Sequence, residues 1–182
     1  MNKRIAVATA LWLGMSATTA ATAETAADAA KPCLTEAEAE AITLVALPEL
    51  IRGTGIACAA TLPPNALLRQ PSSALVGKYQ AAADASWPAA RTALAKVSPP
   101  EIASVLQTDY ARPMLTGMLS GALVGKVNTS NCVPIDRAIN LLAPLPPQNT
   151  AAIVVMVFQL VSADKAKKAE PSPLPICPMS KP

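Results

Sequence analysis

The run Ala151–Val161 (AAIVVMVFQLV) constrains the fold more than any other stretch, because ten of its eleven residues are apolar. A segment that is apolar on every side belongs in a protein interior or in a membrane. Spanning a bilayer takes about 20 apolar residues, and this run ends well short of that at Asp164 and Lys165. Its β-branched residues would also suit a buried strand, but Asn149 and Thr150 offer an N-cap. We therefore expect a central core helix with the rest of the chain packed around it.

Helical periodicity recurs along the rest of the chain and predicts an all-α fold. Two segments, Thr35 to Glu38 and Ser98 to Glu101, fit the capping boxes that begin helices. We expect a single compact domain of five to seven helices around the central apolar helix, with no sheet. The apolar positions spaced three or four apart are Ile42, Val45 and Ala46; Leu75, Tyr79, Ala83, Trp87, Ala90, Leu94 and Val97; Ile102, Val105 and Leu106; and Ile135, Ala138, Ile139 and Leu142.

Residues 1–23 have the pattern of a secretory signal peptide. Lys3 and Arg4 precede an apolar stretch, and Ala21-Thr22-Ala23 is a small-x-small site of the kind that signal peptidase cleaves. Cleavage after Ala23 would leave a periplasmic or secreted protein. The expected divisions are a signal peptide at 1–23, a flexible leader at 24–32, a helical domain at 33–168 and a Pro-rich extended tail at 169–182.

Four cysteines in a chain bound for an oxidising compartment predict two disulfides. A metal site is the weaker interpretation, because the chain has no histidine and no CxxC spacing. If residues 35–58 form one helical rod, its ends lie about 35 Å apart, whereas bridged Cα atoms lie within about 7 Å. We therefore expect Cys58 to pair with Cys132, and Cys33 with Cys177 on the extended tail. A sharp hairpin at Pro48 would instead allow Cys33 to pair with Cys58.

Three glycines, Gly117, Gly121 and Gly125, recur at every fourth residue of one apolar segment. Each costs a helix about 1 kcal/mol relative to alanine, so the close approach of a neighbouring backbone should offset the loss. We expect this helix-packing ridge to lie against Ala151–Val161 inside the molecule. The same spacing occurs at the seams of membrane helices, which makes lipid contact or self-association the alternative.

Composition excludes several classes of function. The absence of histidine excludes Ser-His-Asp and Cys-His nucleophile systems and any imidazole-bound metal. The glycines of the ridge sit within a helical segment, so they do not form a phosphate-binding loop, and we expect neither a cofactor nor a metal. Loss of Lys3 and Arg4 from the 15 basic residues leaves 13 against 12 acidic ones. With this balance and few aromatic residues, nucleic acid is not an expected partner.

A pair of carboxylates is the remaining route to an enzyme. Glu36 and Glu40 share a helix face, and Asp109 neighbours Tyr110 and Arg112, but we interpret these acids as helix-end and surface charges. No catalytic residue is assigned. The sequence predicts a non-enzymatic binding or structural role in the cell envelope, with a protein or a small apolar ligand as partner. The first alternative is an envelope-surface protein that contacts lipid or self-associates through the glycine ridge, without a transmembrane segment after signal cleavage. A carboxylate-based hydrolase is the second.

Overall fold

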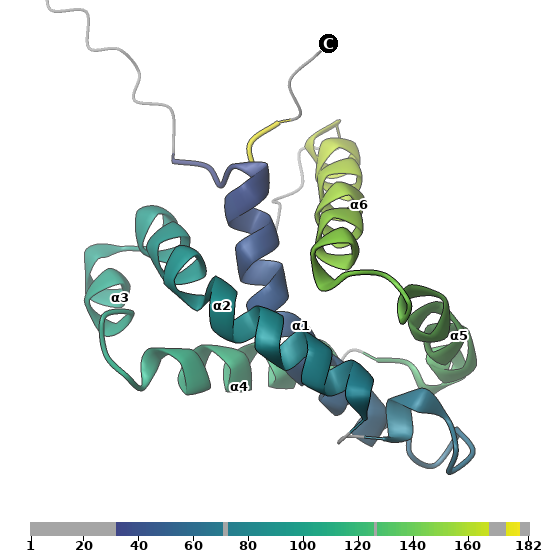
Figure 1. Ribbon diagram of the computed structural model, residues 1–182. Coiled ribbons are helices and arrows are strands. Elements are labelled where there is room, and N and C mark those ends of the chain that lie inside the picture. Colours follow the sequence, from purple (N-terminus) through teal and green to yellow (C-terminus); the bar gives the residue numbers. More distant parts are fainter. Residues whose placement is uncertain (1–31, 71–72, 126, 168–173, 179–182) are drawn as a thin grey trace, which may run out of the picture. The chain divides into compact units, whose positions relative to one another are not determined.

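The structure is a computed structural model that describes residues 32–70, 73–125, 127–167 and 174–178. The expected signal peptide, most of the leader and much of the Pro-rich tail lie outside these residues. The described part is all-α, as predicted, and its one β-type contact is an isolated parallel bridge between Leu34 and Ile176 (Figure 1). The six α-helices in it are α1 (Glu36–Ala57), α2 (Ala74–Val97), α3 (Pro100–Val105), α4 (Ala111–Val124), α5 (Cys132–Leu142) and α6 (Pro147–Lys167), with 3-10 turns η1 (Leu67–Arg69) and η2 (Thr129–Asn131).

Helix α1 is the central helix of the fold. It begins with the predicted capping box: the Thr35 hydroxyl accepts a hydrogen bond from the Glu38 amide, and the Glu38 carboxylate accepts one from the Thr35 amide. The helix then runs through Pro48 without ending and packs against α2, α4 and α6 (Figure 1). The buried residues of α1 are Ala39, Ala41, Ile42, Leu44, Val45, Ala46, Leu47, Pro48, Ile51 and Gly55.

The expectation that Ala151–Val161 is the central helix is therefore wrong. This segment forms the middle of α6, as predicted, and buries Ala151, Val155 and Gln159. Five of its other apolar side chains are 38% to 55% exposed, and Val154 and Phe158 are partly exposed. Helix α1 has an equally uncharged middle between Glu40 and Glu49, and contacts on several sides cover that middle.

Helix α2 packs against α1 and makes hydrogen bonds with the C-terminal part of the helical domain. Its first turn is capped by the Ser73 hydroxyl. The buried Tyr79 hydroxyl makes a 2.8 Å hydrogen bond with the Thr150 hydroxyl in the first turn of α6. The ammonium group of Lys78 donates hydrogen bonds to the carbonyl oxygens of Ala143 (2.6 Å) and Leu145 (2.8 Å). These bonds satisfy acceptors that follow the end of α5, where a cation is also favoured by the helix dipole.

The second predicted capping box is absent. Helix α3 begins at Pro100, its N-cap is Pro99 and no side chain caps it, while Ser98 ends α2. Two prolines in succession explain the difference: each fixes its own φ, and the second biases the first toward extended backbone. The N-cap therefore falls on Pro99, whose side chain has no oxygen to accept a hydrogen bond from the unpaired amides in the first turn of α3.

Both predicted disulfides are present. Cys58 at the end of α1 pairs with Cys132 at the start of α5, with Cα atoms 5.5 Å apart. Cys33 pairs with Cys177, with Cα atoms 5.0 Å apart, and ties the tail back to the start of α1. The first bond lies within an apolar cluster of α1, α2, α5 and α6, and the second adjoins a cluster of α1, α2 and α6 beside Leu34. Each end of the long central helix is thus fixed by one crosslink.

Candidate functional site

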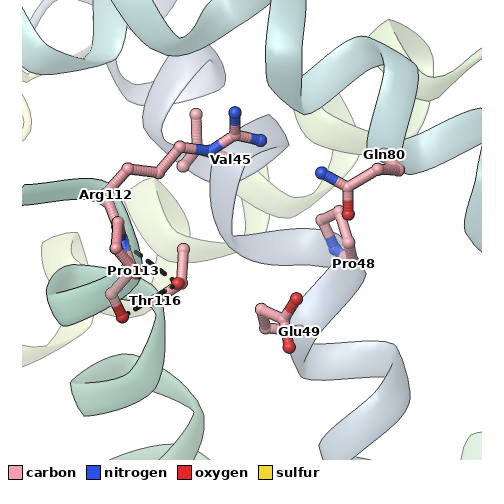
Figure 2. A pocket seen from close by; sticks show the side chains of 7 residues that line it. All are labelled: Val45, Pro48, Glu49, Gln80, Arg112, Pro113 and Thr116. Carbon is pink, nitrogen blue, oxygen red and sulfur yellow. Dashed lines mark hydrogen bonds between the residues drawn. The ribbon is translucent and has the colours of Figure 1, made fainter. Parts of the chain in front are cut away.

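A cleft of about 200 Å³ lies between α1, α2 and α4 and is open to solvent. Figure 2 shows Arg112 on α4 and Gln80 on α2 extending toward each other across it. The Thr116 hydroxyl in its wall bonds the carbonyl oxygens of its own helix, at 3.0 Å to Arg112 and 3.3 Å to Pro113. The lining residues are Val45, Pro48, Glu49, Gln80, Arg112, Pro113 and Thr116.

Three lining residues, Glu49, Gln80 and Arg112, belong to one chain of hydrogen bonds that Arg52 and Asp84 complete beside the cleft. Arg52 pairs with Glu49 and donates to the Gln80 amide oxygen at 3.1 Å. The Gln80 amide nitrogen donates to Asp84 at 3.0 Å, and Arg112 donates to the same carboxylate oxygen at 2.5 Å. The hydrogen bond from Arg112, with that from Gln80 second, lowers the pKa of Asp84 below its ordinary value. Two cations and two anions thus neutralise one another and fasten α4 to α2 and α2 to α1.

This arrangement gives the cleft little means of catalysis. Glu49 lines it but is held by Arg52, and the Thr116 hydroxyl is bonded to backbone carbonyls instead of to a general base. A nucleophilic hydroxyl needs an adjacent base, and a general acid needs a raised pKa. The pKa of Asp84 is shifted in the opposite direction. The network is accounted for by helix packing.

The structure does not bring together the carboxylates that the sequence analysis considered for a hydrolase. Glu36 and Asp109 are exposed, Glu40 is partly exposed, and none of the three lines the cleft of Figure 2. Glu38, between Glu36 and Glu40 in sequence, pairs with Lys96 on α2, and this hydrogen bond is the main cause that lowers its pKa. Glu38 thus has the environment of an ion-paired surface group, which favours its charged form.

The expected packing of the glycine ridge against Ala151–Val161 is wrong. Gly117, Gly121 and Gly125 are exposed, and α4 packs against α1. A Cβ atom placed on Gly117 or Gly121 would meet no described atom within 4 Å outside its own helix. A Cβ atom on Gly125 would lie 3.2 Å from the Gly121 carbonyl oxygen, which belongs to α4 and not to a neighbouring element. The regular spacing on α4 therefore leaves an uncovered strip of backbone in the described structure.

The close backbone approach occurs at a glycine that the sequence reasoning did not single out. A Cβ atom on Gly55 would lie 1.9 Å from the carbonyl oxygen of Leu68 in η1. Gly55 is buried near the end of α1, three residues before Cys58. A sequence signal for this contact was present: Gly55 lies late in a long helix and close to Cys58, whose disulfide brings another segment to the end of that helix.

An apolar stripe runs along the outer side of α6. Its five side chains occupy positions i, i+3, i+4, i+7 and i+8 of the helix, so they share one face. Their exposed fractions lie between 38% and 55%. None of the described helices is long and apolar enough to cross a bilayer. The residues of this α6 stripe are Ile153, Met156, Val157, Leu160 and Val161.

Comparison of the chain with known protein families, curated proteins and solved structures finds no match.

Proposed function

We propose that this protein is exported, loses residues 1–23, and acts in the periplasm or outside the cell as a non-enzymatic binding protein. The signal-like N-terminus supports export. The disulfides are consistent with an oxidising compartment, because such bonds persist there and are rare in a reducing cytosol.

The α6 stripe is the observation that carries the binding role. Contiguous exposed apolar patches mark interaction surfaces more often than singly exposed apolar residues do. Burying a large apolar side chain completely contributes about 1.5–3 kcal/mol, so covering these five half-exposed side chains contributes roughly 5 kcal/mol. Association itself costs about 4–15 kcal/mol. The stripe therefore suits a weak or transient contact whose remaining affinity comes from the polar residues around it.

A partner protein fits this molecule better than a small apolar ligand. A pocket lined by Leu67, Ala74, Leu75, Lys78 and Ala143 measures about 250 Å³, and the apolar cavity between α1, η1 and α5 measures about 90 Å³. Ligand pockets usually enclose about 300–1,000 Å³. The residues that line the cavity between α1, η1 and α5 are Leu47, Leu50, Ile51, Thr54, Leu68, Ile135 and Ile139.

Site-specific photocrosslinking in the producing cells tests the proposal. A photoreactive residue at Val157, in the middle of the α6 stripe, should give a protein adduct of defined mass. A matched probe at Gln148, which is exposed near the start of the same helix and lies off the stripe, should not. Leu160→Lys should abolish the Val157 adduct without loss of helicity. Equal adducts from both probes, no adduct from Val157, or an adduct that survives Leu160→Lys would contradict the proposal.

Contact of α4 with lipid or with a second copy is the second candidate, favoured by the open glycines. Gly117 and Gly121 are uncovered, and Met114 and Met118 beside them are 50% and 65% exposed. Gly121→Leu should then not lower stability, while it reduces vesicle flotation or the light-scattering mass. Wild-type protein that is monomeric and does not float with vesicles would exclude this candidate.

A further inference from the structure

The two disulfides differ in their access to solvent. Cys58 and Cys132 are both 0% exposed and belong to the larger apolar cluster. Cys33 and Cys177 are both partly exposed. Thiol–disulfide exchange requires a thiolate to reach one sulfur of the bond. A reductant can therefore approach the Cys33–Cys177 bond in the folded protein, whereas Cys58–Cys132 becomes accessible only after part of the fold opens.

The accessible disulfide holds a short extended segment, residues 174–178, against the helices. The Leu34 amide donates a 2.7 Å hydrogen bond to the Pro175 carbonyl, and the Cys177 amide donates a 2.8 Å bond to the Leu34 carbonyl. These two bonds form the parallel bridge between Leu34 and Ile176. The segment thus docks beside Leu34 as a short strand would, with the disulfide at its end.

The docked segment covers an apolar seam. Leu174 and Ile176, two residues apart, both pack on the cluster that α1, α2 and α6 share, while Pro175 between them is exposed. Leu34 is 0% exposed beneath this cover. Alternating side chains directed into an apolar surface, together with backbone pairing, are the features of an extended peptide bound to a groove. The buried members of this cluster are Leu34, Ala39, Ala41, Ile42, Val45, Ala90, Ala93 and Val155.

We propose that Cys33–Cys177 is a reducible clasp that controls access to this seam, independently of what α6 binds. The co-reactant is a protein dithiol of an envelope oxidoreductase. One of its thiolates attacks the bond, which releases one of the two cysteines as a thiolate and leaves the other in a mixed disulfide. The second thiolate of the dithiol then displaces that remaining cysteine. Two electrons and two protons pass to Cys33 and Cys177, which become thiols, and the dithiol becomes a disulfide. Opening the clasp releases residues 174–178 and exposes Leu34, while Cys58–Cys132 keeps the helices together.

Stepwise reduction of the folded protein tests the first half of the proposal. Dithiothreitol is added without denaturant, free thiols are blocked with N-ethylmaleimide at intervals, and peptides are mapped by mass spectrometry. Cys33 and Cys177 should be labelled at least about tenfold faster than Cys58 and Cys132, which corresponds to about 1.4 kcal/mol of opening. Equal rates, or faster labelling of Cys58 and Cys132, would refute the assignment of the accessible bond.

A double variant, Cys33→Ser with Cys177→Ser, tests whether the disulfide controls the tail. Hydrogen exchange of the Leu34 and Cys177 amides should accelerate at least about tenfold, while the amides of α2 around Ala83 keep wild-type protection. Unchanged exchange at Leu34 and Cys177 would show that the tail docks without the disulfide, and the clasp would be refuted. A variant that loses its far-ultraviolet helical signal would refute it as well, because reduction would then unfold the protein instead of opening one segment.

Discussion

Replacing Gly55 by alanine places a methyl group where the backbone of η1 already lies. The new Cβ atom would stand 1.9 Å from the Leu68 carbonyl oxygen, whereas ordinary contacts begin at 3.4 Å, so the two must separate by about 1.5 Å. The Leu68 amide is in turn bonded to the Asp136 carboxylate of α5 at 3.1 Å. The carbonyl therefore cannot retreat without disturbing a second helix contact.

The expected magnitude follows from two opposing effects. Overpacking of this kind costs about 1–3 kcal/mol, and occasionally more. Alanine is favoured over glycine within a helix by about 1 kcal/mol, which offsets part of the cost. Gly77→Ala in α2 is the matched control: Gly77 is exposed and its Cβ atom would meet nothing within 4 Å. The difference between Gly55→Ala and Gly77→Ala removes the propensity gain and isolates the steric cost.

Urea and thermal unfolding under non-reducing conditions, followed by far-ultraviolet circular dichroism, measure this difference. Gly55→Ala should be less stable than Gly77→Ala by about 1–3 kcal/mol. For a chain of this size, that difference lowers Tm by about 2–12 °C. If Gly55→Ala is as stable as Gly77→Ala, the close approach of α1 to η1 is wrong.

Two further predictions concern polar contacts. Tyr79→Phe removes the buried 2.8 Å hydrogen bond to Thr150 and should lower the free energy of unfolding by about 1–2 kcal/mol. A double-mutant cycle with Thr150→Val checks this, and a coupling energy near zero would contradict it. Lys96→Met should lower stability near neutral pH by at most about 1 kcal/mol, because its pair with Glu38 is partly exposed. Since pairing lowers the Glu38 pKa, this contribution is present above the ordinary value of 4.5 and is lost as pH falls through the lowered value. Urea unfolding at neutral pH and at about pH 2 checks the sign, and a difference that persists undiminished in acid would contradict it.

Local chemistry and chain geometry were sufficient to predict the fold class and the disulfide pairing. The Thr35–Glu38 capping box depends on side chains three residues apart, so no distant contact is needed to specify it. The pairing rested on one length: an uninterrupted helix from residue 36 to residue 57 keeps Cys33 and Cys58 apart. Pro48 was the weak point of that inference, and α1 continues through it.

The candidate interaction surfaces were much harder to predict. The sequence identified the glycine spacing on α4 and the apolar run of α6 correctly as features, but assigned both of them to the interior. The pairing of Asp84 with Arg112 beside the cleft gave no local signal. Asp84 and Arg112 are 28 residues apart in the chain and meet only because α2 and α4 both pack beside α1.

Sequence alone determined which segments are helical, where α1 begins, and which cysteines can reach each other, because these properties depend on neighbouring residues and on the length of a rigid helix. Tertiary structure decided which of the two apolar helices, α1 or α6, lies at the centre. Helix α1 does so because α2, α4 and α6 cover it on several sides, whereas among the described residues α6 is covered on the side of Ala151, Val155 and Gln159. It also decided that Gly55, and not the α4 glycines, meets another backbone. Apolar periodicity indicates which face of a helix can be buried. Which element covers that face, and how closely, depends on contacts between residues far apart in the chain.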